Sequence, residues 1–196
     1  MELIKFDHLK TFTSKEGYWH TVGYFDIAKD IINTTNINSM LEIGFNIGYS
    51  ANIWLQSGID RLYIIDINFY DDTIPALQAT MNFPDYDNKE IRAWIGDSTS
   101  VLAYNIEDFE NVECTFIDGY HNYINVLLNS YLAINYGSKY IVYDDVHKEM
   151  LGDHVYKAIL KLESLGLIEL VKEYPRILEN DSVDGFVSLY KVRTRE

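Results

Sequence analysis

The chain has 196 residues, of which 47% are hydrophobic and 23% charged, and its formal net charge is −14. This length suits one domain with a substantial core. The negative charge argues against a nucleic-acid partner, because binding to phosphates depends on a positive patch. No stretch approaches the ~20 apolar residues that cross a bilayer, so no membrane partner is expected. The single cysteine, Cys114, lies in an apolar run and is expected to be buried, which suits a reducing cytoplasm.

Short apolar runs alternate with helical patterns along the chain, as is typical of a parallel sheet covered by helices. Helical stripes occupy residues 24–32, 123–134 and 155–166. The last two expected strands are joined without a helix-length pattern, which favours an antiparallel hairpin. The predicted fold is therefore α/β: a Rossmann-like, doubly wound, seven-stranded sheet, mostly parallel, with a C-terminal antiparallel hairpin. Its expected strands are residues 40–44, 61–67, 90–95, 113–118, 139–144, 167–173 and 185–192.

The N-terminal part of the chain precedes the predicted sheet. We expect residues 1–37 to form a helical extension and residues 38–196 to form the main domain. The aromatic segment around Trp19 and His20 could cover a pocket as a lid, although packing is the simpler interpretation. The prolines at positions 75, 84 and 175 are expected in loops or at sheet edges.

The sequence "LEIGFNIGYS" ends the first predicted strand and opens a helix. Gly44 and Gly48 would let the backbone approach a ligand closely. A dinucleotide-binding turn would read G-x-G-x-x-G, but Asn46 and Tyr49 stand in its second and third glycine positions. Glu42, near the end of the strand, would repel a pyrophosphate and suits a ligand that carries an ammonium and a sulfonium.

Two further strand ends carry acids. Asp66 follows the second apolar run, where a carboxylate can accept hydrogen bonds from both ribose hydroxyls. Asp97 follows the third and could accept from an adenine amine, while the backbone of Ser98 could reach the ring edge. Either residue would equally serve as the N-cap of the next helix. Because NAD enzymes also use an acid like Asp66, these positions indicate an adenosine nucleoside without identifying the cofactor.

The stretch "FIDGYHNY" ends the fourth predicted strand, and "YDDVH" ends the fifth. Three carboxylates, Asp118, Asp144 and Asp145, are thus expected near one point, where they would repel one another unless a cation lay between them. Oxygen ligands suit Mg²⁺, Mn²⁺ or Ca²⁺. The simpler alternative is that His121 caps the next helix and the aspartates cap turns.

"LEIGFNIGYSA" resembles the E-x-G-x-G-x-G motif of the class I S-adenosylmethionine-dependent methyltransferases, with Asn46 in the central glycine position. "IDGYHNY" and "YDDVH" resemble the metal-assisted O-methyltransferases of the catechol and macrolide-sugar type. The resemblance implies that His121 is a general base and that Asp118, Asp144 and Asp145 hold Mg²⁺ or another divalent cation, with Asp118 also counted as catalytic. It implies an S-adenosylmethionine site formed by Glu42, Gly44, Asn46, Gly48, Asp66, Asp97 and Ser98.

The activity implied by this resemblance is transfer of a methyl group from S-adenosylmethionine to a hydroxyl of a small-molecule acceptor. The alternatives are a nucleotide-dependent oxidoreductase, a non-catalytic binding module on the same fold, and a methyltransferase that uses His121 without a metal. No pattern in the sequence identifies the acceptor. Small members of this fold often dimerise, so the resemblance allows a homodimer.

Overall fold

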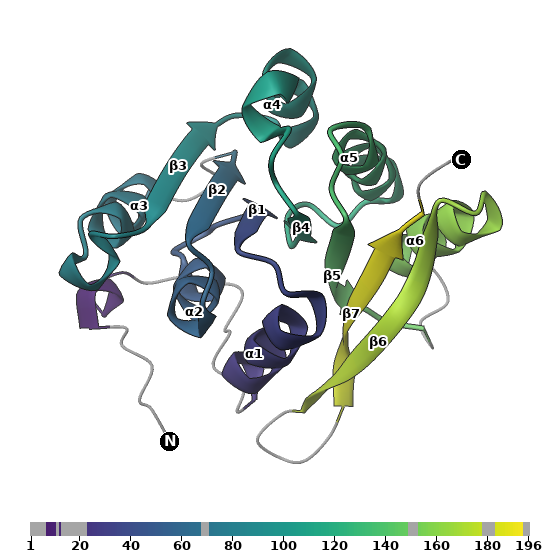
Figure 1. The fold of residues 1–196 in the computed structure, drawn as a ribbon, viewed down its shortest axis with the longest axis horizontal. Coiled ribbons are helices and arrows are strands. Elements are labelled where there is room, and N and C mark those ends of the chain that lie inside the picture. Colours follow the sequence, from purple (N-terminus) through teal and green to yellow (C-terminus); the bar gives the residue numbers. More distant parts are fainter. Residues whose placement is uncertain are drawn as a thin grey trace.

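A computed structural model of the chain describes residues 7–10, 12, 23–67, 71–148, 153–177 and 183–193. Helices and strands alternate along it (Figure 1). The described α-helices are α1 (Tyr24–Thr35), α2 (Tyr49–Ser57), α3 (Thr73–Met81), α4 (Ser98–Tyr104), α5 (Tyr123–Asn135) and α6 (His154–Ser164). The strands are β1 (Ser39–Ile43), β2 (Arg61–Asp66), β3 (Glu90–Ile95), β4 (Cys114–Ile117), β5 (Tyr140–Val146), β6 (Ile168–Ile177) and β7 (Val183–Val192). Short 3-10 helices are η1 (Asp7–Leu9), η2 (Pro84–Tyr86) and η3 (Ile106–Phe109).

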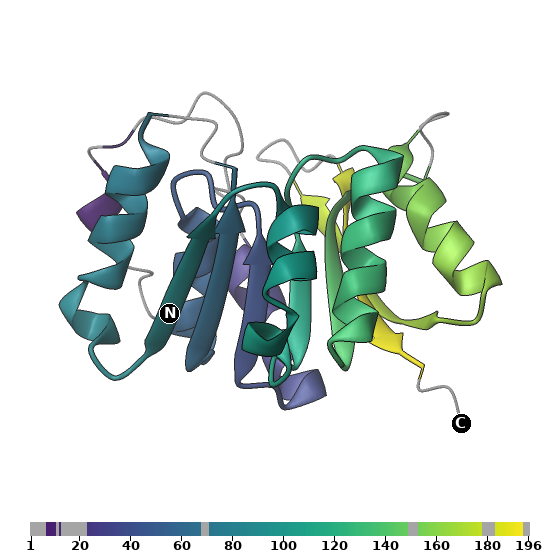
Figure 2. The same cartoon turned by 90° about the horizontal axis from the view of Figure 1, so that it is seen from above.

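The described strands form one seven-stranded sheet in the order β3-β2-β1-β4-β5-β7-β6. Strands β1 to β5 are parallel, whereas β7 runs antiparallel to both β5 and β6. The strand order reverses between β1 and β4, which is where open α/β sheets bind ligands. The carboxyl ends of the parallel strands share one edge of the sheet, at the top of Figure 2. The predicted fold class is confirmed.

Helices cover both faces of the sheet (Figure 2). One core cluster joins α1, α2 and α3 to the sheet through residues such as Ile31, Trp54 and Leu77, and the other joins α4, α5 and α6 to the opposite face. Because helices lie on both faces, every residue of β1 and β4 is buried, which explains their continuous apolar runs. Cys114 is buried with a free thiol, as expected.

Some elements differ from the sequence-based expectation. Pro75 lies in the first turn of α3 rather than in a loop, and its missing N–H breaks no helical hydrogen bond there. Pro175 lies at a sheet edge, as expected, but within β6, which is longer than the predicted strand. Strand β5 also continues past Asp144 to Val146, which pairs with Phe186 after a shift in register.

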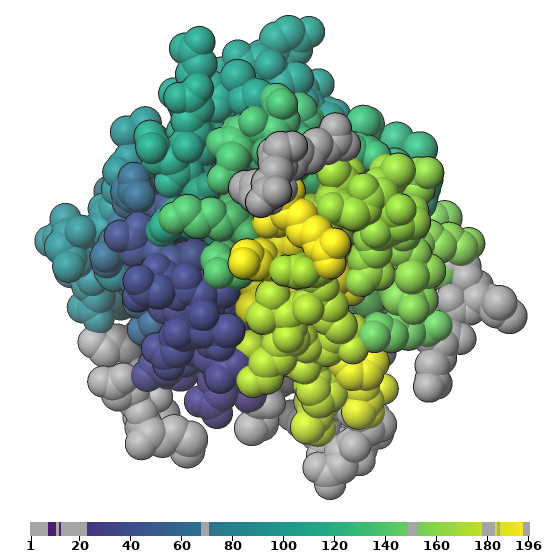
Figure 3. Space-filling view, turned by 45° about the vertical axis from the view of Figure 1, so that its right-hand side comes forward, coloured from purple at the N-terminus to yellow at the C-terminus, as the bar shows by residue number. Residues whose placement is uncertain are grey.

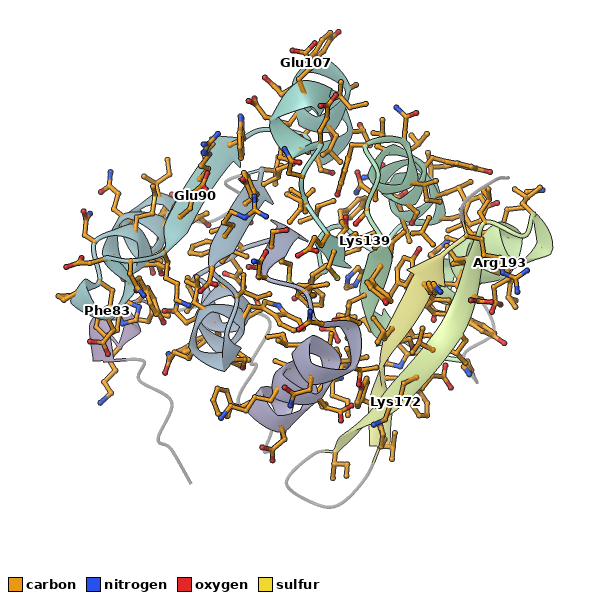
Figure 4. The ribbon with its side chains drawn as sticks, viewed as in Figure 1. Phe83, Glu90, Glu107, Lys139, Lys172 and Arg193 are labelled. Carbon is orange, nitrogen blue, oxygen red and sulfur yellow. The ribbon has the colours of Figure 1, made fainter. Side chains whose placement is uncertain are left out.

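Helix α1 packs against the sheet and lies beside β6, as the space-filling view shows in indigo and yellow-green (Figure 3). Asp30 of α1 accepts hydrogen bonds from Lys172 Nζ at 2.8 Å and Tyr174 Oη at 2.6 Å, both on β6 (Figure 4 labels Lys172). The segment around Trp19 and His20, for which a lid and simple packing were the two interpretations, falls outside the described residues, and the boundary at residue 37 stays a prediction. Among the described helices, none has the length and apolar character to span a membrane.

Candidate active site

The glycine turn between β1 and α2 lies against the end of β4. Gly44 has a φ of 98°, and a Cβ there would lie 2.3 Å from the carbonyl oxygen of Asp118 and 2.8 Å from Gly119 Cα. The backbone N–H of Gly44 donates to the Ile65 carbonyl at 2.9 Å, and that of Asp118 donates to Ile43 at 2.9 Å. The first motif and "FIDGYHNY" are therefore in direct backbone contact, and only glycine fits at position 44.

The rest of the turn uses left-handed backbone at two more positions. Asn46 has a φ of 52°, a conformation that asparagine adopts more readily than most side chains. This explains how Asn46 can occupy the position of a motif glycine. Gly48 has a φ of 84°, and a Cβ there would lie 2.4 Å from the Phe45 ring. The aromatic ring thus packs directly against the backbone of the turn.

Asp66 at the end of β2 holds this turn. Its Oδ2 accepts from the backbone N–H groups of Phe45 at 2.7 Å and Asn46 at 3.0 Å. A carboxylate has about four lone-pair sites, so these bonds are compatible with the expected contact to ribose hydroxyls. The sequence placed Asp66 correctly at the strand end but gave no sign of its bonds to the turn.

Glu42 lies beneath the turn, where it is completely buried. Ser50 Oγ of α2 donates to its Oε1, and its Oε2 has no hydrogen-bond partner among the described residues. Burial raises the pKa of Glu42 to about 8; the Ser50 hydrogen bond opposes this shift and the charge of Asp66 adds to it. A neutral Glu42 that links β1 to α2 is better suited to supporting the turn than to attracting an ammonium group.

The residues after β3 form a helix cap. The Asp97 carboxylate accepts from Ser100 N at 2.9 Å and Thr99 Oγ1 at 2.5 Å, so Asp97 is the N-cap of α4. These bonds, first from Thr99 and then from Ser100, lower the pKa of Asp97. Ser98 Oγ donates to Asn129 Oδ1 of α5 at 3.0 Å. The capping role is confirmed, and contacts of Asp97 and Ser98 with adenine stay predictions.

At the ends of β4 and β5, three side chains converge. His121 Nδ1 lies 3.1 Å from Asp145 Oδ2, and His121 Nε2 lies 3.8 Å from Asp118 Oδ1. One potential ligand atom from each of these residues lies within 4.8 Å of the others. The N-cap of α5 is Asn122, whose side chain accepts from Asn125 N at 2.9 Å. The alternative in which His121 caps this helix is therefore wrong.

Asp144 faces a different environment from Asp145. It is buried, Tyr24 Oη of α1 donates to its Oδ1 at 3.5 Å, and Arg176 Nη1 lies 3.6 Å from its Oδ2. Burial raises the pKa of Asp144 to about 6, reinforced by the charge of Asp145 and opposed by that of Arg176. The structure thus brings Asp118 and Asp145 together with His121, whereas Asp144 lies between Tyr24 and Arg176.

The separation of the two acids follows from the local backbone. Asp145 has a φ of 53°, and the register between β5 and β7 shifts between Tyr143 and Val146. Aspartate tolerates this left-handed conformation, and a bulge of this kind redirects side chains. Of the sequence pair "DD", only Asp145 therefore lies in the group with Asp118 and His121.

Arg176 of β6 was missed by the sequence analysis. Its guanidinium donates to Asp145 Oδ1 and so lies between the two acids. Burial opposes ionisation of Asp145, but the His121 hydrogen bond and the Arg176 charge outweigh it and lower its pKa to about 2. His147 Nε2 lies 4.0 Å from the same Oδ1. The sequence "YPRI" does not indicate that Arg176 reaches the site, because the predicted strand ends at residue 173 and leaves residues 174–177 in a connection.

The group of Asp118, His121 and Asp145 fits a divalent cation on the chemistry of its donors. Two carboxylates and one imidazole offer hard oxygen and borderline nitrogen ligands, and their spacing would let them share one ion. His121 Nε2 is buried without a hydrogen-bond partner among the described residues. A cation, a water or a substrate hydroxyl would satisfy it.

Several solved structures resemble the whole of this fold. An O-methyltransferase from Bacillus cereus, solved with S-adenosylhomocysteine, matches with a TM-score of 0.66 and 14% identity, over 93% of this chain and 85% of that one. A putative O-methyltransferase from Klebsiella pneumoniae gives 0.67 and 16%, over 95% and 86%. The Streptomyces achromogenes O-methyltransferase TomG, involved in tomaymycin synthesis and solved with S-adenosylmethionine, gives 0.65 and 15%, over 87% and 79%.

No protein-family model matches the sequence, and neither does any curated protein. At such low identities the structural likeness establishes the fold. The chain therefore has the class I fold of S-adenosylmethionine-dependent O-methyltransferases, as the resemblance of its motifs implied.

Proposed function

We propose that the protein transfers a methyl group from S-adenosylmethionine to a hydroxyl oxygen of a small-molecule acceptor, with a divalent cation in the site. The observation that carries this proposal is the contact of Gly44 with the Asp118 carbonyl. It places the glycine turn, which would hold the methionine part of the cofactor, directly beside the Asp118, His121 and Asp145 group. A methyl donor and a bound hydroxyl could therefore meet at this point.

In this proposal the cofactor lies along the carboxyl ends of β1, β2 and β3. The turn from Gly44 to Gly48 offers backbone groups to the methionine part, and Asp66 accepts from the ribose hydroxyls. Asp97 and Ser98 lie at the start of α4, where they would border the adenine. Glu42 supports the turn from below through Ser50.

Asp118 and Asp145 would bind the cation, and His121 would accept the proton of the acceptor hydroxyl. Asp145 Oδ2 lies beside His121 Nδ1, which favours the tautomer that carries a proton on Nδ1. Nε2 then keeps its lone pair and can act as a general base. When bound, a divalent cation lowers the pKa of a coordinated hydroxyl and fixes its orientation. Asp144, expected as a third ligand, instead serves to position Arg176.

Isothermal titration of the purified protein with S-adenosylhomocysteine tests the cofactor assignment. We expect saturable binding by the wild type and no binding of NADH, since the turn lacks two of the glycines of a dinucleotide-binding motif. The Asp66→Ala variant should bind S-adenosylhomocysteine more weakly. Absence of heat at millimolar S-adenosylhomocysteine would refute the proposed function, and NADH binding would favour the oxidoreductase alternative.

The cytoplasmic location and a homodimeric state belong to the same proposal. The buried free thiol of Cys114 supports a reducing compartment. Size-exclusion chromatography with light scattering would measure the oligomeric state directly.

A further inference from the structure

Arg176 occupies the position that a cation would take between Asp144 and Asp145. Its guanidinium donates to Asp145 Oδ1, lies 3.6 Å from Asp144 Oδ2, and leaves only 14% of the side chain exposed. It comes from β6, which is separated from β5 in the sheet by β7. Arg176 therefore offsets part of the repulsion between these two neighbouring carboxylates.

The two oxygens of Asp145 have different partners. Oδ1 accepts a hydrogen bond from the guanidinium of Arg176, whereas Oδ2 lies 3.1 Å from His121 Nδ1. Arg176 therefore leaves Oδ2 as the oxygen that points toward the group with Asp118. It also pairs with buried Asp144, which is held by Tyr24 on its other oxygen.

The site as a whole keeps an excess of negative charge. Asp118, Asp144 and Asp145 supply three carboxylates, and Arg176 supplies one permanent positive charge that is largely shielded from water. At these short separations and partial burial, the guanidinium weakens the attraction of the carboxylates for any second cation. Arg176 and a divalent metal are thus in electrostatic competition for Asp145.

We propose that Arg176 is a built-in counter-cation that sets the metal affinity of this site, holding it below the affinity that the three acids would otherwise give. The inference rests on the proposed metal site and adds to it a residue that does not touch the metal. Arg176 acts through Asp145 and is a positioning residue. The consequence is a weakly and reversibly bound metal rather than a permanently resident one.

Titration of Mn²⁺ into the purified protein, followed by the loss of the electron paramagnetic resonance signal of the free ion, tests this. We expect Arg176→Gln to bind Mn²⁺ at least about tenfold more tightly than the wild type, because it removes a positive charge beside the ligands. Arg176→Lys keeps the charge and should stay closer to the wild type. Arg193→Gln removes a charge from the exposed pair with Glu169 and should change the affinity by less than about twofold, because solvent screens it (Figure 4).

The Mn²⁺ affinities of the two Arg176 variants distinguish an effect of the charge on metal binding from an effect of Arg176 on the fold. If Arg176 only braced the fold, both of its variants would weaken Mn²⁺ binding, and this would overturn the inference. Unchanged affinity in Arg176→Gln, or absence of Mn²⁺ binding by wild type and variant alike, would overturn it as well. Titrating the same samples with S-adenosylhomocysteine reports on the cofactor site, so the proposed methyl donor can stand when the metal inference fails.

Discussion

Replacing Glu42 with glutamine should stabilise the protein, and the gain should depend on pH. Glu42 is completely buried under the glycine turn, and burial raises its pKa from 4.5 to about 8. Glutamine has nearly the same shape as the protonated acid and can still accept the hydrogen bond from Ser50 Oγ. The variant therefore removes the titration while keeping the packing.

The raised pKa of Glu42 determines how the stability of the wild type changes with pH. Between pH 4.5 and about 8 the folded protein keeps a proton on Glu42 that the unfolded chain has lost. The contribution of Glu42 to stability is complete below pH 4.5 and is lost as the pH rises toward about 8, by about 1.4 kcal/mol per pH unit. The Glu42→Gln variant escapes this loss, so at pH 7 its free energy of unfolding should exceed that of the wild type by about 3 kcal/mol.

Urea unfolding followed by tryptophan fluorescence, to which buried Trp54 contributes, measures this difference at pH 5, 6, 7 and 8 without cofactor. Glu107→Gln is the matched control, because Glu107 lies exposed on η3 (Figure 4) and should give no such trend. A difference between Glu42→Gln and the wild type that stayed constant from pH 5 to 8 would refute the reasoning. So would a variant that is less stable than the wild type at pH 8.

Three further variants test the site. Gly44→Ala should weaken S-adenosylhomocysteine binding by at least about tenfold, because a Cβ would clash with the Asp118 carbonyl; Gly137→Ala, also at positive φ but with open space around it, should leave binding unchanged in the same titration. Asn52→Leu should lower the free energy of unfolding by about 1–3 kcal/mol in urea, because buried Asn52 donates to the Gly48 carbonyl at 2.7 Å. Asp118→Asn should weaken Mn²⁺ binding about tenfold or more, and unchanged affinity would exclude this carboxylate as a ligand.

The parts of the fold that depend on local pattern could be predicted from the sequence. Strands buried on both faces read as continuous apolar runs, and the parallel order places their ends at one edge. The contact between the glycine turn and Asp118 follows from β1 and β4 being neighbours in the sheet. The capping role of Asp97 could be predicted from its position after the third strand, where a helix was expected to begin.

The parts that depend on pairing between distant segments could not be predicted. The register shift after Tyr143 and the left-handed backbone of Asp145 turn the two adjacent acids in different directions. Asp145 faces His121 and Asp144 faces Tyr24, although both lie beside Arg176. Nothing local to "YDDVH" signals this, because it arises from the pairing of β5 with β7. Arg176 reaches the acids only because β6 continues through Pro175, which as an edge-strand residue disrupts no pairing on its open side. Helix α3 could not be predicted because Pro75 is more typical of a loop than of a helix.

A crystal structure of the protein soaked with S-adenosylhomocysteine and MnCl₂, with anomalous data, tests the central claim most directly. We predict one manganese peak in contact with the carboxylates of Asp118 and Asp145 beside His121, and S-adenosylhomocysteine seated on the turn from Gly44 to Gly48. Its sulfur should face the metal. Manganese bound elsewhere, or a cofactor that lies away from this turn, would contradict the account.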